Sequence, residues 1–360
     1  MKFIFPSNSL LSSIAAISIE NCISDNIYIK NDKLQSFGRL YSINSYSKMY
    51  LANLGIWKNL DKDKITPYKY IDVYQNNKKT IEFNSSDINI SFLGYIVNEE
   101  DLINAVNKKL SEANKINLFK KIPIFNKHSS INILTNFRDV NNTGQSVTYQ
   151  QKDYDQVAIN ITISHSSTNG KIPRQIFYKD EILGFLPIDE HNYNLIWSLP
   201  NKLFKKIISS SSEQYIKLIN DRAKFILGDI EKIIIGNSFP LSSRHADKYF
   251  YNNNLLIGEA AHKFHPLAGL GLNMGIEDIS ILHQLLSTYD SSQKIFHEYA
   301  IKRINRNLSL QKILDLIINF HASKIISNKY KQLILNYFNN SMLVKSKIIK
   351  NATGSINQKI

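Results

Sequence analysis

Residues 255–278, LLIGEAAHKFHPLAGLGLNMGIED, constrain the fold of this chain more than any other stretch. An apolar, strand-like run ends at Gly258, and an acidic residue, Glu259, follows it. The next loop leads into a helix that we expect to start near Leu272, and the loop contains Pro266, Gly269 and Gly271. A carboxylate at a strand end accepts hydrogen bonds from sugar-like hydroxyls, glycines let the backbone approach a flat ligand, and a helix N-terminus attracts an anion. The segment therefore predicts a site for a flat, anionic, hydroxyl-bearing ligand.

A second strand–turn–helix signal lies at the N-terminus. The apolar run 3–5 precedes PSNSLLSS, residues 6–13, and a helix-like run and a second strand-like run follow. A dinucleotide-binding unit begins in this order and has Gly-x-Gly-x-x-Gly at the turn. Here the same spacing holds Ser7, Ser9 and Ser12. A side chain at a turn with positive φ costs about 1–2 kcal/mol, and its Cβ keeps a pyrophosphate away from the backbone, although serine hydroxyls can donate to phosphate.

Composition excludes several function classes. The chain has 360 residues, is 43% hydrophobic and carries a formal net charge of +14. Only seven of its 44 basic residues are Arg, and the basic residues are scattered, so we expect no nucleic-acid partner. The single Cys22 excludes an intrachain disulfide and suits a reducing cytoplasm. His262 and His265 have a spacing seen in metal sites, but no further Cys or carboxylate cluster supports a metal.

The periodicity of apolar residues changes along the chain. Residues 69–73 and 80–83 predict a hairpin, 100–110 a helix, and 158–164 a strand of an antiparallel sheet. After residue 275 the pattern is helical. Two apolar stripes occur there, one with Ile313, Leu316, Ile317 and Phe320 and one with Leu333 and Tyr337. Such stripes are typical of a packed core, and in basic helices they also suit a membrane surface.

The 255–278 segment resembles the flavin-binding motif of the FAD-dependent aromatic hydroxylases, and more closely those of ubiquinone biosynthesis. Shorter stretches resemble the same family in the same order over nearly the whole chain. They are Gly38-Arg39, 54–57, 93–97, Leu186-Pro187, 196–198, 239–241 and 352–354.

The resemblance implies roles for individual residues. Glu259, directly after Gly258, takes the position that holds the ribityl chain of FAD, and Arg39 takes that of a cofactor-contacting arginine. Ser7, Ser9 and Ser12 take the positions of the pyrophosphate-binding glycines. The positions against the isoalloxazine ring are held by Pro266, Gly269, Gly271, Leu272 and Asn273. No catalytic acid or base is identified.

The departures from the family pattern gather at the ADP end of the expected site. Lys30 stands at or beside the position of the acid that holds the adenosine ribose, and Ile103 stands where a polar contact is common. Residues 134–140 contain no Asp-Gly pair, and Glu259 replaces an Asp. Several such losses predict weakened FAD binding, at about 1.4 kcal/mol for each factor of ten.

These observations predict an α/β fold in which a Rossmann-like FAD-binding domain is interleaved with a smaller antiparallel substrate sheet. We expect residues 1–70, 99–145 and 236–360 in the FAD-binding domain with C-terminal helices, and 71–98 and 146–235 in the substrate domain.

The resemblance implies an FAD-dependent monooxygenase that hydroxylates a polyprenylated phenol ring in ubiquinone biosynthesis. It further implies a lipophilic substrate and an external electron donor, either NAD(P)H or a ferredoxin-type protein. The expected location is the cytoplasm, with association at the inner membrane face or in a biosynthetic complex. The alternative is a degenerate homologue that binds FAD weakly or not at all and acts as a structural partner in such a complex.

Overall fold

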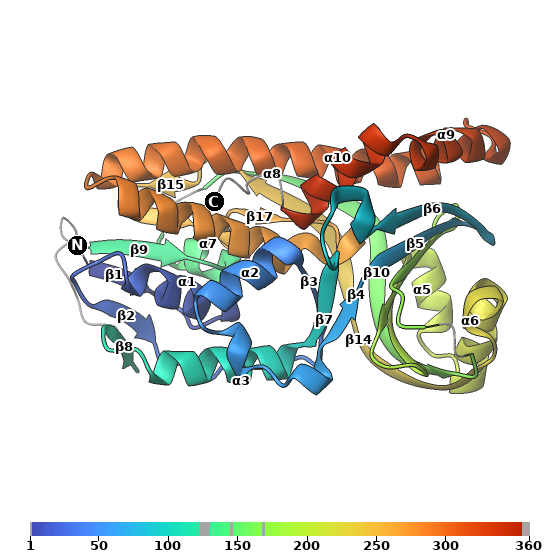
Figure 1. Cartoon of the computed structure of the whole chain (residues 1–360), viewed down its shortest axis with the longest axis horizontal. Coiled ribbons are helices and arrows are strands. Elements are labelled where there is room, and N and C mark those ends of the chain that lie inside the picture. Colours follow the sequence, from blue (N-terminus) through green and yellow to red (C-terminus); the bar gives the residue numbers. More distant parts are fainter. Residues whose placement is uncertain (1, 122–129, 145–146, 168–169, 355–360) are drawn as a thin grey trace. The chain divides into compact units, whose positions relative to one another are not determined.

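The computed structural model describes residues 2–121, 130–144, 147–167 and 170–354 (Figure 1). The chain forms two compact units, each built from separate stretches of sequence. Unit 1 comprises Met1–Lys64, Val97–Lys152 and Ser242–Lys312, and unit 2 comprises Ile65–Ile96, Asp153–Leu241 and Ile313–Ile360. The sequence pattern grouped residues 313–360 with the first domain, whereas they cluster here with unit 2. The predicted boundary at residues 145 and 146 lies outside the described residues.

Unit 1 is built on a mostly parallel six-stranded sheet. Its order is β15-β16-β9-β1-β2-β8, and only the β15–β16 pair is antiparallel. Ile4 lies opposite Tyr28 of β2 and Asn132 of β9, and the apolar residues of β1 are buried because helices and strands cover both faces. The strands are β1 Lys2–Phe5, β2 Ile27–Lys30, β8 Ile116–Phe119, β9 Ser130–Leu134, β15 Phe250–Tyr251 and β16 Asn254–Leu256.

The helices of unit 1 bring its two ligand-binding signals together. α1 lies between α3 and α7 and packs against both (Figure 1). The helices are α1 Leu10–Glu20, α2 Ser45–Asn53, α3 Glu99–Ser111, α4 Phe137–Asn142 and α7 Leu270–Thr288, and α8 Ser292–Ala322 begins in this unit. Strand β3 Leu40–Asn44 precedes α2, and β17 His262–Lys263 pairs with the end of β14.

Unit 2 holds the long antiparallel strands that the middle of the sequence predicts. In this unit the order is β14-β10-β13-β12-β11-β5-β6, and the β11–β5 pair is parallel. The strands are β5 Tyr70–Gln75, β6 Lys78–Asn84, β10 Tyr149–His165, β11 Arg174–Phe177, β12 Ile182–Pro187, β13 Asn192–Pro200 and β14 Ile230–Ala246. A short pair of strands, β4 Thr66–Tyr68 and β7 Gly94–Asn98, completes the strands of this part of the chain.

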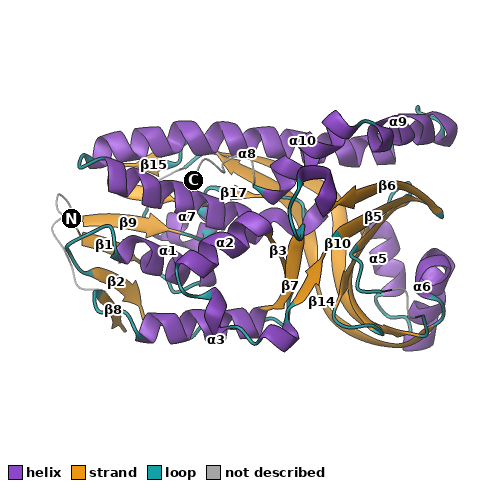
Figure 2. Ribbon diagram, viewed as in Figure 1, coloured by secondary structure: helices purple, strands orange, loops and turns teal. Residues whose placement is uncertain are grey.

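One face of the unit 2 sheet carries a hydrophobic core with α5 and α6 against it (Figure 2). Trp197 of β13 is fully buried there, and its indole N–H donates to Glu181 at 2.8 Å. The helices of this unit are α5 Asn201–Ile207, α6 Ser212–Leu227, α9 Asn328–Asn340 and α10 Met342–Thr353.

The predicted elements are present: the hairpin is β5–β6, the helix 100–110 falls within α3, and the strand 158–164 lies in β10. The predicted α/β class with an antiparallel sheet and C-terminal helices is confirmed.

Candidate functional site

The N-terminal serine turn and the Gly258 turn lie at one place in unit 1. Gly258 has φ +58°, and a Cβ added to it would lie 2.5 Å from Leu11 Cδ1 of α1. A Cβ on Gly275 of α7 would lie 2.7 Å from the same atom. The first turn of α1 therefore packs directly against the segment 255–278, and the absence of two side chains allows this approach.

The serine turn is a helix cap and is not strained. Ser9 is the N-cap of α1 with φ −137°, and its Oγ accepts a hydrogen bond from the Ser12 N–H at 3.0 Å. The hydroxyls of Ser9, Ser12 and Thr135 bond to one another at 2.7–2.9 Å. None of Ser7, Ser9 and Ser12 has positive φ. The strain that the sequence led us to expect is thus absent, because the turn uses an ordinary N-cap geometry.

Ser7 links the turn to α4. Its hydroxyl donates to Asp139 Oδ2 at 2.8 Å and accepts from Asn136 Nδ2 at 2.6 Å. Burial raises the pKa of the Asp139 carboxyl above its ordinary value, while the bonds from Ser7 and from the backbone partly oppose the rise. Residues 134–140 therefore lack an Asp-Gly pair but still place a buried carboxyl beside the turn.

The start of α1 retains backbone donors for an anion. Ser12 N–H is used by the cap, and Ser13 N–H bonds to the Ser9 carbonyl at 2.9 Å. Helix geometry leaves the N–H groups of Leu10 and Leu11 without an intrahelical acceptor. The positive end of the helix dipole lies at the same point.

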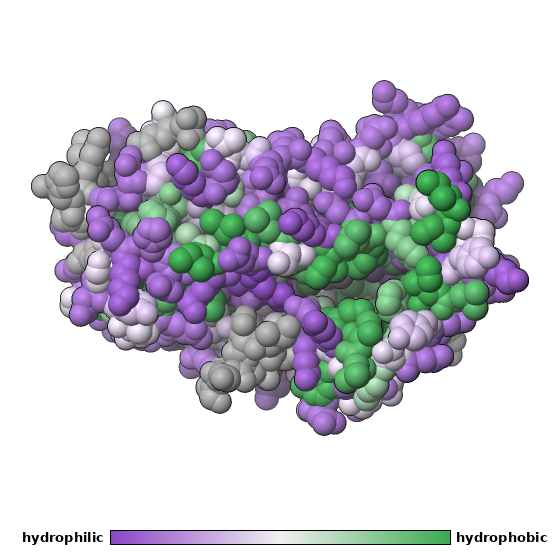
Figure 3. All heavy atoms as spheres, turned by 90° about the horizontal axis from the view of Figure 1, so that it is seen from above, coloured by the Kyte–Doolittle hydropathy of each residue, from purple (hydrophilic) through white to green (hydrophobic). Residues whose placement is uncertain are grey.

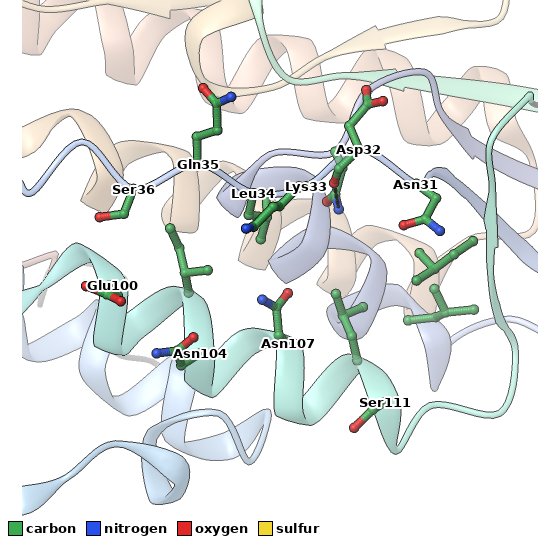
Figure 4. Close-up of a pocket in the computed structure, with 15 residues that line it drawn as sticks. Asn31, Asp32, Lys33, Leu34, Gln35, Ser36, Glu100, Asn104, Asn107 and Ser111 are labelled. Carbon is green, nitrogen blue, oxygen red and sulfur yellow. Dashed lines mark hydrogen bonds between the residues drawn. The ribbon is translucent and has the colours of Figure 1, made fainter.

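A cavity of about 940 Å³ lies beside this turn (Figure 4). It is bounded by α3, by the end of the parallel sheet and by the segment 31–36 that follows β2. Ile103 lines it, as the sequence comparison implied, but Asn104 and Asn107 of α3 line it as well. Figure 4 shows Asn107 pointing toward the 31–36 segment.

A carboxylate lies close to Lys30, two residues later in the sequence. Asp32 lines the cavity, and its carboxylate contacts Lys30 Nζ at 2.9 Å. The Asn8 amide, from the serine turn, donates to the Asp32 carbonyl at 2.9 Å. Counting along the sequence could not find this acid, because the chain turns after β2 and brings Asp32 back to the cavity.

Arg39 lies on an exposed segment whose backbone is held by a buried carboxylate. Glu99 Oε2 accepts hydrogen bonds from Phe37 N–H at 2.6 Å and from Arg39 N–H at 3.3 Å, and Glu99 Oε1 accepts from the Tyr41 hydroxyl at 2.7 Å. Burial raises the pKa of Tyr41, and the nearby Glu99 adds to the rise. The Arg39 guanidinium lies 5.0 Å from the centre of the Phe37 ring. Glu99 is therefore a positioning residue that the sequence did not reveal.

The Gly258 turn is held by a buried ionic network. Asp278 Oδ2 accepts from Gly258 N–H at 2.9 Å and lies 2.6 Å from His262 Nε2, while Arg303 Nε donates to Asp278 Oδ1 at 2.6 Å. Burial opposes ionisation of Asp278, but His262 and Arg303 outweigh it and hold the pKa of Asp278 well below its ordinary value. Glu259, which follows Gly258 in the sequence, is exposed, and no hydrogen bond joins it to this network among the described residues.

The end of the loop before α7 and the first turn of that helix present mainly backbone. Gly269 has φ +60° and caps α7, and Gly271 is exposed with no atom within 4 Å of an added Cβ. Leu272 is half-buried, as is Pro266. Asn273 is buried: its side chain accepts from Asn44 N–H at 2.9 Å and donates to the carbonyls of Ser42 at 2.7 Å and Gly269 at 3.2 Å. Asn273 thus fixes the loop, whereas Gly271 leaves room for a flat group.

Comparison with known proteins shows which proteins this chain is similar to. The family model described as "FAD binding domain" matches residues 138–307. The 3-demethoxyubiquinol 3-hydroxylase of Escherichia coli (strain K12) is 23% identical over 304 residues, which cover 77% of each chain. The mitochondrial ubiquinone biosynthesis monooxygenase COQ6 of Xenopus tropicalis is 23% identical over 353 residues, covering 79% of this chain and 76% of its own.

A solved structure shares the fold. That of the p-nitrophenol 4-monooxygenase PnpA from Pseudomonas putida DLL-E4 superposes with a TM-score of 0.75 at 11% identity and covers 98% of both chains.

Proposed function

We propose that this chain, a homologue of the FAD-dependent hydroxylases of ubiquinone biosynthesis, hydroxylates the aromatic ring of a polyprenylated phenol. The names of its relatives supply the substrate class. The observation that carries the proposal is the close packing of the α1 turn against the Gly258 turn, because it joins the two parts that an FAD molecule must bridge.

We assign cofactor contacts along this site from the ADP end to the ring. The N–H groups of Leu10 and Leu11 bind the pyrophosphate beside the hydroxyls of Ser7, Ser9 and Ser12. The cavity lined by Asp32, Asn104 and Asn107 takes the adenosine. The ribityl chain lies at Gly258 and Glu259, and the ring lies against Pro266, Gly269, Gly271, Leu272 and the backbone of Asn273. Arg39 contacts the cofactor from its exposed segment.

The residues assigned above bind and orient the cofactor, and we assign no acid or base to the substrate. FAD, when bound, supplies the reductive activation of oxygen. The N-terminus of α7 stabilises negative charge on a ring placed against Gly271, because its N–H groups have no side-chain cap. An electron-rich phenol supplies part of its own reactivity. An external donor, NAD(P)H or a ferredoxin-type protein, provides the electrons, and the cytoplasmic face of the inner membrane is the natural location for so lipophilic a substrate.

The serine network supports a second candidate. The hydroxyls of Ser9, Ser12 and Thr135 bond to one another where the family has bare glycine backbone. A chain in which this network excludes the pyrophosphate would keep the fold and act as a structural partner in a biosynthetic complex.

FAD binding separates the two candidates. We expect the purified protein to acquire a bound-flavin visible spectrum. With FAD at about 100 times its dissociation constant, the folded state gains about 2.7 kcal/mol and the unfolding temperature rises. No bound-flavin spectrum and no thermal stabilisation would reject the enzyme and favour the structural partner. Product analysis with a prenylated phenol and a chemical reductant then tests the hydroxylation itself.

A further inference from the structure

Helix α9 carries an apolar stripe on its exposed side. Its members follow the spacing i, i+3, i+4, i+7 and i+8, and each side chain is between 37% and 69% exposed. They are Tyr330, Leu333, Ile334, Tyr337 and Phe338. A five-residue stripe of this kind normally faces a core, so its exposure requires an explanation.

The opposite side of α9 is fixed to unit 2. Leu335 is buried, and Asn339 Oδ1 accepts from Glu82 N–H of β6 at 3.0 Å. Lys331 is buried too, and its ammonium donates to the carbonyls of His321 at 2.6 Å and Ser323 at 2.8 Å, at the end of α8. The helix therefore has a defined core-facing side, and the apolar stripe is not on it.

More apolar surface lies on either side of the stripe in the sequence. Ile325, before α9, is 96% exposed, and Met342 and Leu343, at the start of α10, are also exposed. Figure 3 shows that hydrophobic side chains are exposed among hydrophilic ones on the face it views. We call Ile325, the five stripe residues, Met342 and Leu343 the α9 surface.

The segment that carries this surface is basic. Residues 316–354 contain six Lys and no Asp, Glu or Arg, and one of these lysines, Lys345, pairs with Asp87 at 3.1 Å. Lys324, Lys329 and Lys347 are exposed. Exposed tyrosine and lysine side chains can each place an apolar part in lipid and a polar end in water. No helix of the described residues is long and apolar enough to span a bilayer.

We propose that the α9 surface docks onto an anionic lipid bilayer. Apolar side chains with lysines around them suit insertion at the level of acidic headgroups. A second copy of the chain would bring like charges together across the same surface, which disfavours it as the occupant. The inference does not rest on flavin binding, since all the residues involved lie in unit 2.

Co-sedimentation of the FAD-supplemented full chain with lipid vesicles tests the proposal. One set of vesicles contains phosphatidylcholine alone, and the other adds phosphatidylglycerol. We expect binding to the anionic vesicles, weaker binding to the neutral ones, and a loss of binding as salt is raised. The double variant Leu333→Glu/Tyr337→Glu should lower vesicle affinity at least about tenfold, because it places charge in the inserted stripe.

The control is Ile208→Glu, which changes an isoleucine of unit 2 that is 57% exposed, close to the 56% of Leu333. The Ile208→Glu variant should bind vesicles like the unchanged chain. Both variants should have the circular dichroism spectrum and unfolding temperature of the unchanged chain. Three results would overturn the proposal: no binding to anionic vesicles, equal loss in the control, or a dimer that binds no vesicles and that the double variant dissociates. The last would assign the surface to self-association. If the chain does not bind the added FAD but still binds vesicles, only the proposed catalytic function is rejected.

Discussion

The serine turn at residues 6–13 and the glycine loop at 258–271, which we assign to two ends of one site, are built in different ways. At the serine turn, side-chain hydroxyls fill the space that glycines leave open elsewhere, and they cap α1 without positive φ. At the glycine loop, Gly258 and Gly269 have positive φ, and a Cβ on Gly258 would force the Leu11 side chain to move. Glycine can therefore be replaced where a helix cap sets the backbone, whereas at Gly258 both the backbone conformation and the neighbouring helix disfavour a side chain.

The largest effect should come from Gly258→Ala. Positive φ costs about 1–3 kcal/mol, and the clash with Leu11 adds about 1–3 kcal/mol of overpacking. We expect the free energy of unfolding in urea to fall by about 2–6 kcal/mol. The control is Gly144→Ala, with φ +67° and nothing within 4 Å of its Cβ. Equal losses in both variants would show that Leu11 contact is unimportant.

Replacing Ser7, Ser9 and Ser12 together with glycine should move stability and FAD affinity in opposite directions. Loss of the hydroxyl network, including the bond to the buried Asp139, should lower the unfolding free energy by about 2–4 kcal/mol. An FAD titration should show roughly tenfold tighter binding, because the backbone can approach the pyrophosphate more closely. Unchanged affinity would mean that this turn is not the pyrophosphate site.

The network behind Gly258 should make stability depend on pH. Burial lowers the pKa of His245 from 6.5 to about 4, and His245 Nε2 accepts from Tyr249, which also bonds Asn307. The folded pKa lies below the unfolded one, so the stabilisation is complete above pH 6.5 and is lost as the pH falls toward 4.

Urea unfolding between these pH values measures the slope. The variant His245→Gln should flatten the slope only in part, because burial also lowers the pKa of His321, to about 3. His297→Gln, at an exposed position of α8, is the control and should leave the slope unchanged. A slope that His245→Gln does not alter would contradict the assignment.

The smallest change in stability should come from Asp32→Asn. The pair with Lys30 is exposed, so the unfolding free energy should change by less than about 0.5 kcal/mol. FAD affinity should fall about tenfold if Asp32 accepts from the adenosine ribose. Asp290→Asn, at an exposed position, is the control. If Asp32→Asn binds FAD as tightly as the unchanged chain, Asp32 is not part of the cofactor site.

Local patterns predicted most of the fold. The glycines and the apolar run of 255–278 predicted the strand, turn and helix that contain Gly258 and α7. The alternation of apolar and polar residues predicted β10. What the sequence could not show are side-chain contacts across long separations. Thr135 meets Ser9 across 126 residues, Asp139 meets Ser7 across 132, and Glu99 meets Arg39 across 60. These partners have no local signal, because the pairing of distant strands brings their segments together: the parallel sheet for the two serines, and β3 beside β7 for Glu99 and Arg39.

The apolar stripe with Leu333 and Tyr337 shows a second limit of prediction from sequence. The spacing of Leu333 and Tyr337 is helical, as predicted, but periodicity alone does not tell which side of a helix is covered. Both side chains are exposed, so the interpretation of this stripe as core was wrong. Burial of Lys331 and Leu335 on the other side decides the orientation of α9.

Titration of Gly271→Ala with FAD tests the central claim most directly, since no atom beyond the neighbouring residues and backbone of its own helix lies within 4 Å of the added Cβ. We expect an unfolding free energy that is unchanged or slightly higher in the apoprotein, because Ala favours helix by up to about 1 kcal/mol. We expect FAD affinity to fall at least about tenfold, because the methyl group occupies the place of the flavin ring. The control, Gln284→Ala at an exposed position of the same helix, should bind FAD normally. FAD affinity in Gly271→Ala equal to that of the unchanged chain would contradict the placement of the ring at the start of α7.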